Sequence, residues 1–95
     1  MIITRTPFRV SFFGGGTDYP AWYEKNGGAV LSTTINKYCY ISCRYLPPFF
    51  DHKYRIRYTF REETGSIAEI KHAAVRKCLE FLGVERGIEM VHTSD

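Results

Sequence analysis

Residues 7–20, Pro-Phe-Arg-Val-Ser-Phe-Phe-Gly-Gly-Gly-Thr-Asp-Tyr-Pro, contain the feature around which the rest of the chain is organised. Apolar and polar side chains alternate over residues 8–12, which predicts a strand. Asp18 or Tyr19 can cap a short helix whose first turn tolerates Pro20, and Asn26-Gly27-Gly28 should end it. A bend of three glycines, residues 14–16, therefore joins a strand to a helix.

Further strands are predicted on both sides of this bend. Residues 2–3 are β-branched and predict a strand that Pro7 interrupts. Residues 29–35 are β-branched and nearly uncharged, which predicts a strand buried on both faces. Residues 38–46 predict another strand, and Pro47-Pro48 should stop it because proline has no N–H to donate to a sheet.

The second half of the chain adds two strands and a helix. Residues 54–61 alternate between apolar and polar, which predicts a strand with one solvated face. Residues 66–69 form an S-x-x-E capping box, and apolar side chains recur at helical spacing up to Gly83. Residues 88–92 predict a last strand. We therefore predict an α+β fold: a mostly antiparallel sheet with one long helix on a face.

Composition restricts the class of protein. With 44% hydrophobic and 16% aromatic residues, the 95-residue chain should form one domain, residues 1–95, with a core. The net charge of +3 comes without a run of like charge, so charge alone does not indicate nucleic acid and fits a phosphorylated small molecule as well. No apolar stretch approaches the ~20 residues of a membrane span and no secretory signal is visible, so we expect a cytoplasmic protein.

The cysteines and histidines do not suggest a metal site. On one strand, Cys39 and Cys43 would lie about 13 Å apart, beyond the reach of a disulfide. We therefore interpret these two residues and Cys78 as reduced core cysteines. The three histidines lack paired ligand spacing, so no metal site is expected.

The glycine bend is the first candidate for a binding site. Each glycine costs roughly 0.5–1 kcal/mol of backbone entropy, and three together leave no side chain to pack. The bend matches neither a dinucleotide-binding fingerprint nor a P-loop. It is either a flexible turn or a place where ligand hydroxyls or an anion approach the backbone.

Three side chains beside the bend leave alternatives open. Asp18 is either a helix N-cap or an acceptor for two sugar hydroxyls, and Thr17 could add a hydroxyl contact. Arg9 is either a solvated strand residue or a fixed cation aimed at a phosphate.

The aromatic residues should be mostly core. The stripe formed by Arg55, Arg57 and Arg61 is either a solvated sheet face or a phosphate contact, which keeps an RNA-binding module as a competing class.

Residues 7–20 resemble the first motif of the GHMP small-molecule kinases, the superfamily named for galactokinase, homoserine kinase, mevalonate kinase and phosphomevalonate kinase. The triple-glycine form, with residues 22–23 and 27–32, is most similar to the bacterial D-glycero-D-manno-heptose phosphate kinases. Residues 38–42 and 44–50 strengthen this match, and the resemblance covers essentially the whole chain. It implies transfer of a phosphoryl group from ATP, aided by Mg²⁺, to a heptose phosphate in lipopolysaccharide or surface-glycan synthesis.

The resemblance also assigns roles to residues. Galactokinases carry a Glu-His pair where this chain has Gly15 and Gly16, so the resemblance makes galactose an unexpected substrate. Asp18 corresponds to the ligand of the sugar hydroxyls, and Arg9 to the arginine near the transferred phosphoryl group, which makes Arg9 the catalytic candidate. The resemblance implies a sugar-binding set of Gly14, Gly15, Gly16, Thr17, Asp18 and Tyr19.

The parts of the family pattern that hold ATP and Mg²⁺ are expected mainly outside these residues. The Gly-Leu-Gly-Ser-Ser loop, which binds the ATP phosphates, should begin just after Asp95. We therefore expect the 95 residues alone to be inactive, and to self-associate, exchange strands or require the rest of the kinase. Alternative interpretations are that the chain belongs to a fucokinase-like or other GHMP kinase, or that it is a stand-alone ligand- or RNA-binding module.

Overall fold

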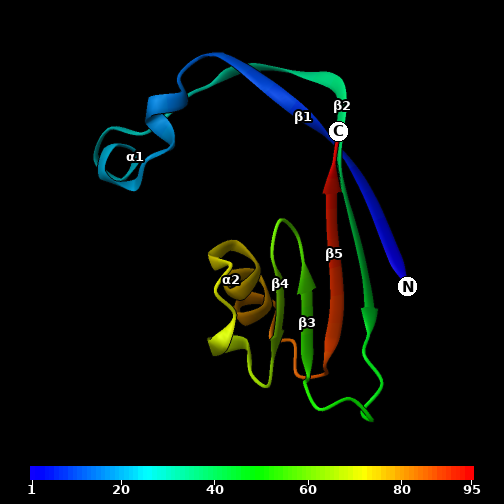
Figure 1. Cartoon of the computed structure of the whole chain (residues 1–95). Coiled ribbons are helices and arrows are strands. Elements are labelled where there is room, and N and C mark those ends of the chain that lie inside the picture. Colours follow the sequence, from blue (N-terminus) through cyan, green and yellow to red (C-terminus); the bar gives the residue numbers. More distant parts are fainter.

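Two long paired strands form the spine of the molecule in the computed structural model, which describes residues 1–95. Near one end of the spine a smaller hairpin, a further strand and a helix pack together, and at the other end a short helix projects from it (Figure 1). The elements in chain order are β1 (Ile2–Phe13), η1 (Gly15–Asp18), α1 (Pro20–Asn26), β2 (Leu31–Tyr45), β3 (Tyr54–Arg57), β4 (Arg61–Thr64), η2 (Ile67–Glu69), α2 (Ala73–Leu82) and β5 (Ile88–Ser94).

The five strands form one sheet in the order β1-β2-β5-β3-β4. Three of the four pairings are antiparallel, and β3 runs parallel to β5. The predicted α+β class with a mostly antiparallel sheet is therefore confirmed.

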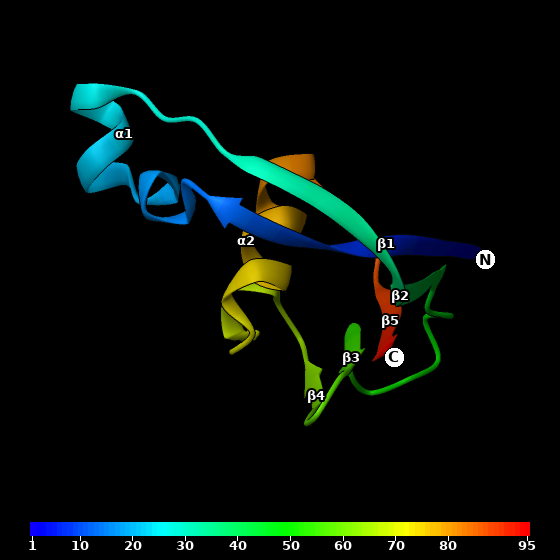
Figure 2. The same cartoon turned by 90° about the horizontal axis from the view of Figure 1, so that it is seen from above.

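The core is small and lies between α2 and the half of the sheet that β3 and β5 form. Only six of the 95 residues are buried. Five of these form one cluster, and α2 contributes Leu79 to it; its members are Tyr54, Ile56, Ile70, Leu79 and Ile88. Seen from above, α1 and the ends of β1 and β2 next to it extend well beyond this cluster (Figure 2). No helix of the chain has the length and apolar character needed to cross a membrane.

The first strand is continuous, so the predicted interruption at Pro7 is wrong. Pro7 lies within β1 and pairs with Tyr38, and the register shifts between Pro7 and Arg9. Because β1 is an edge strand, a residue without an N–H donor is tolerated there.

The two strands predicted for residues 29–35 and 38–46 are one strand, β2. The prediction of burial on both faces is also wrong, because Leu31 to Lys37 are all exposed. This half of β2 pairs only with β1, so neither of its faces is covered by another layer.

The strand predicted for residues 54–61 is instead a hairpin. β3 ends at Arg57, and Tyr58 N–H donates to the carbonyl of Phe60 at 2.9 Å where the chain reverses. The apolar alternation continues through this turn because Tyr58 packs against the core from the turn itself.

The single long helix predicted from Ser66 is a 3-10 turn, η2, followed by the ten-residue α2. Ser66 Oγ donates to Glu69 Oε1 at 3.2 Å, so the capping-box side chains meet in η2 rather than at the start of α2. Gly83 ends α2 as predicted, with φ of +63°. The three cysteines are free, but only Cys43 packs against the core; Cys39 is half-buried and Cys78 on α2 is exposed, which corrects the prediction that all three belong to the core.

Candidate functional site

The glycine bend lies at the end of the β1–β2 pair that carries α1 (Figure 1). Gly14 ends the strand in a left-handed conformation, and Thr17 N–H donates to the Gly14 carbonyl at 2.9 Å to close the turn of η1. Tyr19 is then the N-cap of α1, with Pro20 in the first turn. Asp18 therefore is not the helix cap, and its carboxylate makes no capping hydrogen bond.

The three glycines of the bend differ in whether the packing of the chain requires glycine at that position. Gly14 has φ of +93°, and a Cβ there would clash with the carbonyl oxygen of Ala29, so the packing of the chain itself requires glycine. A Cβ on Gly15 or Gly16 would meet nothing within 4 Å. Internal packing thus explains only the first glycine and leaves the backbone of the other two open to a ligand.

Thr17 ties the bend to the chain that enters β2. Its Oγ1 lies 2.7 Å from the carbonyl oxygen of Gly14 and 3.2 Å from that of Ala29. A hydroxyl has one hydrogen, which these two carbonyls share, so only the lone pairs of Oγ1 are left to accept from a ligand.

Arg9 and Asp18 face each other across the bend. Arg9 extends from β1, and its Nη2 lies 3.6 Å from Asp18 Oδ2 on η1. Their side chains are 54% and 53% exposed, and such an exposed pair contributes at most about 1 kcal/mol to stability. The pair therefore presents one cation and one acceptor to solvent instead of holding the fold together.

A cavity of about 340 Å³ opens beside this pair, lined by Thr17, Asp18, Tyr23, Gly28, Ala29 and Val30. The structure thus brings Thr17 and Asp18 together in one hollow with Arg9 next to it. Gly14, Gly15 and Gly16 do not line the hollow, and Tyr19 is 69% exposed outside it.

Sequence reasoning missed the far wall of the hollow, which Tyr23 and residues 28–30 form. The signal for this wall was the pair Gly27-Gly28, which ends α1 and returns the chain past Thr17. No pattern in the sequence indicated that this return lies next to Asp18.

The hollow is suited to hydroxyl groups. An ionised carboxylate only accepts hydrogen bonds, so Asp18 can hold two neighbouring hydroxyls while Tyr23 supplies an apolar wall. No group of three His, Cys, Asp or Glu side chains lies close enough to hold a metal ion without further ligands.

Comparison with known proteins gives one informative match. No protein-family model and no curated protein matches the chain. The fold is similar to the crystal structure of a D-glycero-D-manno-heptose 1-phosphate kinase from Bacteriodes thetaiotaomicron, with a TM-score of 0.65 and 17% sequence identity. The match covers 98% of this chain and 33% of the kinase, so the chain spans about a third of that protein's length. At this identity the likeness establishes a shared fold.

Proposed function

We propose that these residues are the sugar-binding, N-terminal part of an ATP-dependent GHMP-type sugar kinase that phosphorylates a heptose phosphate in the cytoplasm. The observation that carries the proposal is the pairing of Arg9 with Asp18 beside an open glycine backbone, in a fold shared with a heptose 1-phosphate kinase. The pathway we propose is heptose synthesis for lipopolysaccharide or another surface glycan.

Each part of the site has a role in this proposal. Asp18 accepts hydrogen bonds from two sugar hydroxyls and orients the ring. The bare backbone of Gly15 and Gly16 lets the sugar approach closely. Arg9, whose Nη2 lies 3.6 Å from Asp18, then holds a positive charge near the bound sugar, where it stabilises charge on the transferred phosphoryl group.

ATP and Mg²⁺ belong mainly to residues beyond this chain in our proposal. The sequence contains no Gly-Leu-Gly-Ser-Ser loop, and the structure has no cluster of three His, Cys, Asp or Glu side chains that could hold a metal ion. Phosphoryl transfer depends on a phosphate-binding loop and a metal ion, which position the reactants and neutralise their charge. The 95 residues alone should therefore not catalyse the reaction. A coding sequence that continues past Asp95 into such a loop would support this, and a stop codon there would favour a stand-alone binding module.

The remainder of the kinase would also cover the apolar surface on either side of α2. Two hollows lie there, of about 330 and 270 Å³, and both are lined mostly by hydrophobic side chains. Leu79 contributes to both, while Phe81 and Leu82 on the same helix are 89% and 70% exposed. A surface of this kind indicates a missing partner, which we assign to the rest of the chain.

A kinase assay on the complete polypeptide with ATP and a panel of heptose, fucose and galactose derivatives tests the function. We expect activity on a heptose phosphate and none on galactose. Asp18→Asn should raise the KM for the sugar by about tenfold or more, because the lost charge weakens bonds to hydroxyls, while the KM for ATP changes by less than about twofold.

The matched control is Glu24→Gln on α1, which removes the same charge from a side chain that makes no ion pair. It should leave both KM values unchanged. An Asp18→Asn enzyme with the wild-type sugar KM would remove Asp18 from the sugar site.

A further inference from the structure

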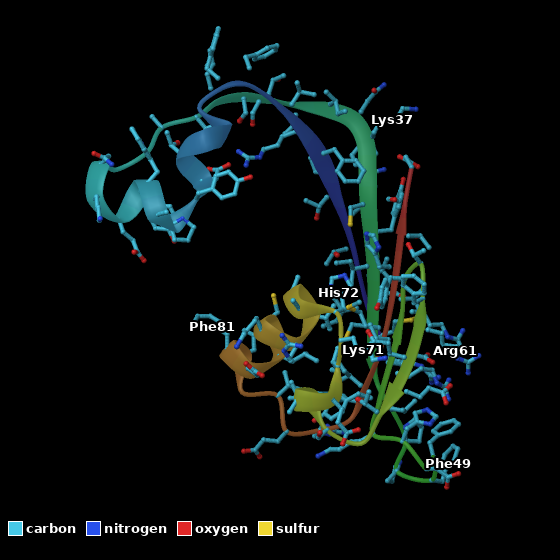
Figure 3. The ribbon with its side chains drawn as sticks, turned by 60° about the vertical axis from the view of Figure 1, so that its left-hand side comes forward. Lys37, Phe49, Arg61, Lys71, His72 and Phe81 are labelled. Atoms are coloured by element: carbon cyan, nitrogen blue, oxygen red, sulfur yellow. The ribbon has the colours of Figure 1, made fainter.

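We propose that the face of the sheet opposite α2 binds a phosphoryl group, free or esterified, between Arg57 and Arg61. This site is separate from the glycine bend and does not depend on the proposed kinase function. Arg61 extends from the side of the sheet away from α2 (Figure 3).

The strand register places a set of charged residues on this face. Arg55 and Arg57 alternate along β3 with the core residues Tyr54 and Ile56, so they lie on the opposite face. Directly paired residues share a face, and β3 pairs Arg57 with Arg61 and Arg55 with both Glu63 and Glu89. Arg44 joins them through its pairing with Glu89 on β5.

Half of the positive charges on this face are neutralised by its glutamates. Arg44 Nε and Arg55 Nη1 share the carboxylate of Glu89, at 2.8 and 2.6 Å. Arg61 Nη2 lies 2.6 Å from Glu63 Oε1. Arg57 belongs to no ion pair, so four arginines face two glutamates and two positive charges remain.

The Nε–H group of Arg57 also lacks a hydrogen-bond acceptor. Its Nε is buried from solvent and donates to no acceptor in the chain. Such a donor carries an uncompensated desolvation cost, and water cannot satisfy it without a movement of the side chain. A merely solvated arginine would not have this feature, which argues against a purely solvated face.

The position of Arg61 adds to this cost. Arg57 and Arg61 are directly opposite across the β3–β4 hairpin, and like charges in this arrangement repel each other. An anion between the two guanidinium groups would relieve the repulsion and, once Arg57 turns its Nε edge outward, supply the missing acceptor. Arg61 is 59% exposed and gives only Nε and Nη2 to Glu63, so its Nη1 remains available.

The ligand chemistry follows from the two guanidinium groups. Each presents N–H donors in a planar fork that matches two oxygens of a phosphate. A phosphoryl group carries close to two negative charges and three acceptor oxygens, so it can engage both arginines at once. A carboxylate has one charge and two oxygens and would satisfy only one of them.

The experiment is an NMR titration of the labelled complete polypeptide at constant ionic strength, following the Nε–H signals of its arginines. The probes are inorganic phosphate, methyl phosphate and acetate. We expect a saturable shift of the Arg57 signal with either phosphate and a much weaker response to acetate. Tighter binding of methyl phosphate would identify an ester as the source, and tighter binding of inorganic phosphate would identify the free ion; both support the site.

Arg57→Gln should weaken phosphate binding by about tenfold or more, because it removes charged hydrogen bonds. The matched control, Lys37→Gln, removes one positive charge from an exposed position in the middle of β2 (Figure 3) and should change affinity by less than about twofold. An Arg57 signal that does not move with phosphate in the wild-type chain would overturn the proposal, as would equal shifts with acetate. This wild-type measurement decides the matter even if Arg57→Gln fails to fold.

Discussion

Arg9 and Asp18 show how two exposed residues can be set up for a ligand rather than for stability. The two charged groups lie 3.6 Å apart and are about half exposed to solvent, so their attraction is too weak to hold η1 against β1. The internal bonds of the bend come instead from Thr17 and from the close contact of Gly14 with Ala29. Because these contacts fix the backbone, the Arg9 and Asp18 side chains remain available to a substrate.

The glycines of the bend can be separated by mutation. Gly14→Ala should lower the free energy of unfolding by about 2 kcal/mol or more, because a Cβ is strained at this φ and clashes with Ala29. Gly16→Ala should leave stability unchanged or raise it by about 0.5 kcal/mol, because alanine restricts the unfolded chain. Thermal unfolding of the two variants measures the difference.

The same variants distinguish packing from ligand access. Gly16→Ala should weaken sugar binding in the complete polypeptide even though its fold is intact. If Gly16→Ala loses as much stability as Gly14→Ala, the bend is packed internally at both positions and the open-backbone argument fails.

Among the elements, α2 depends on a residue from the opposite hairpin. Glu62 on β4 accepts from the backbone N–H groups of Lys71 at 2.7 Å and His72 at 3.2 Å, and from Tyr58 Oη at 2.8 Å. Its carboxylate thereby anchors the segment between η2 and α2. Desolvation by burial acts to raise the pKa of Glu62, but these donors outweigh it and the net pKa lies below its usual value.

A lowered pKa means that the folded state binds this proton less readily than the unfolded chain does. The stabilisation from Glu62 is therefore complete above the ordinary glutamate pKa and is lost as pH falls through the lower, folded-state pKa. Glu62→Gln should lower stability at neutral pH by about 1 kcal/mol and flatten the loss of stability between about pH 5 and 3.

Urea unfolding at several pH values measures this effect. Glu85→Gln, which changes an exposed side chain without ion-pair partners, is the control and should keep the wild-type profile. A Glu62→Gln variant whose stability falls with acid as steeply as the wild type would show that Glu62 does not anchor α2.

The elements also show where sequence patterns suffice. The period-two pattern predicted strand character at residues 54–57 and 88–92 because one face of each strand contacts the core. It failed at the β3–β4 turn, since Tyr58 packs on the core without being in a strand. The capping box likewise did not locate the start of α2, because the acceptor that anchors the preceding segment is Glu62, which lies before the box on β4.

At the scale of the whole molecule, the sequence was sufficient for the class of fold but not for its shape. The α+β class follows from local patterns, and the contact between Thr17 and Ala29 does not, because it depends on how β2 returns along β1. The absence of cover over β2 residues 31–35 was equally unpredictable, since their uncharged sequence, rich in β-branched residues, is typical of a buried strand. Arg9 and Asp18 were found from their motif, whereas Tyr23 required the structure.

The crystal structure of the complete polypeptide with a bound heptose phosphate tests the central claim most directly. We predict that the sugar ring lies against the backbone of Gly15 and Gly16, with two of its hydroxyls within hydrogen-bond distance of the Asp18 carboxylate and its reacting hydroxyl near Arg9. A sugar bound elsewhere, with this bend facing only solvent, would contradict the account.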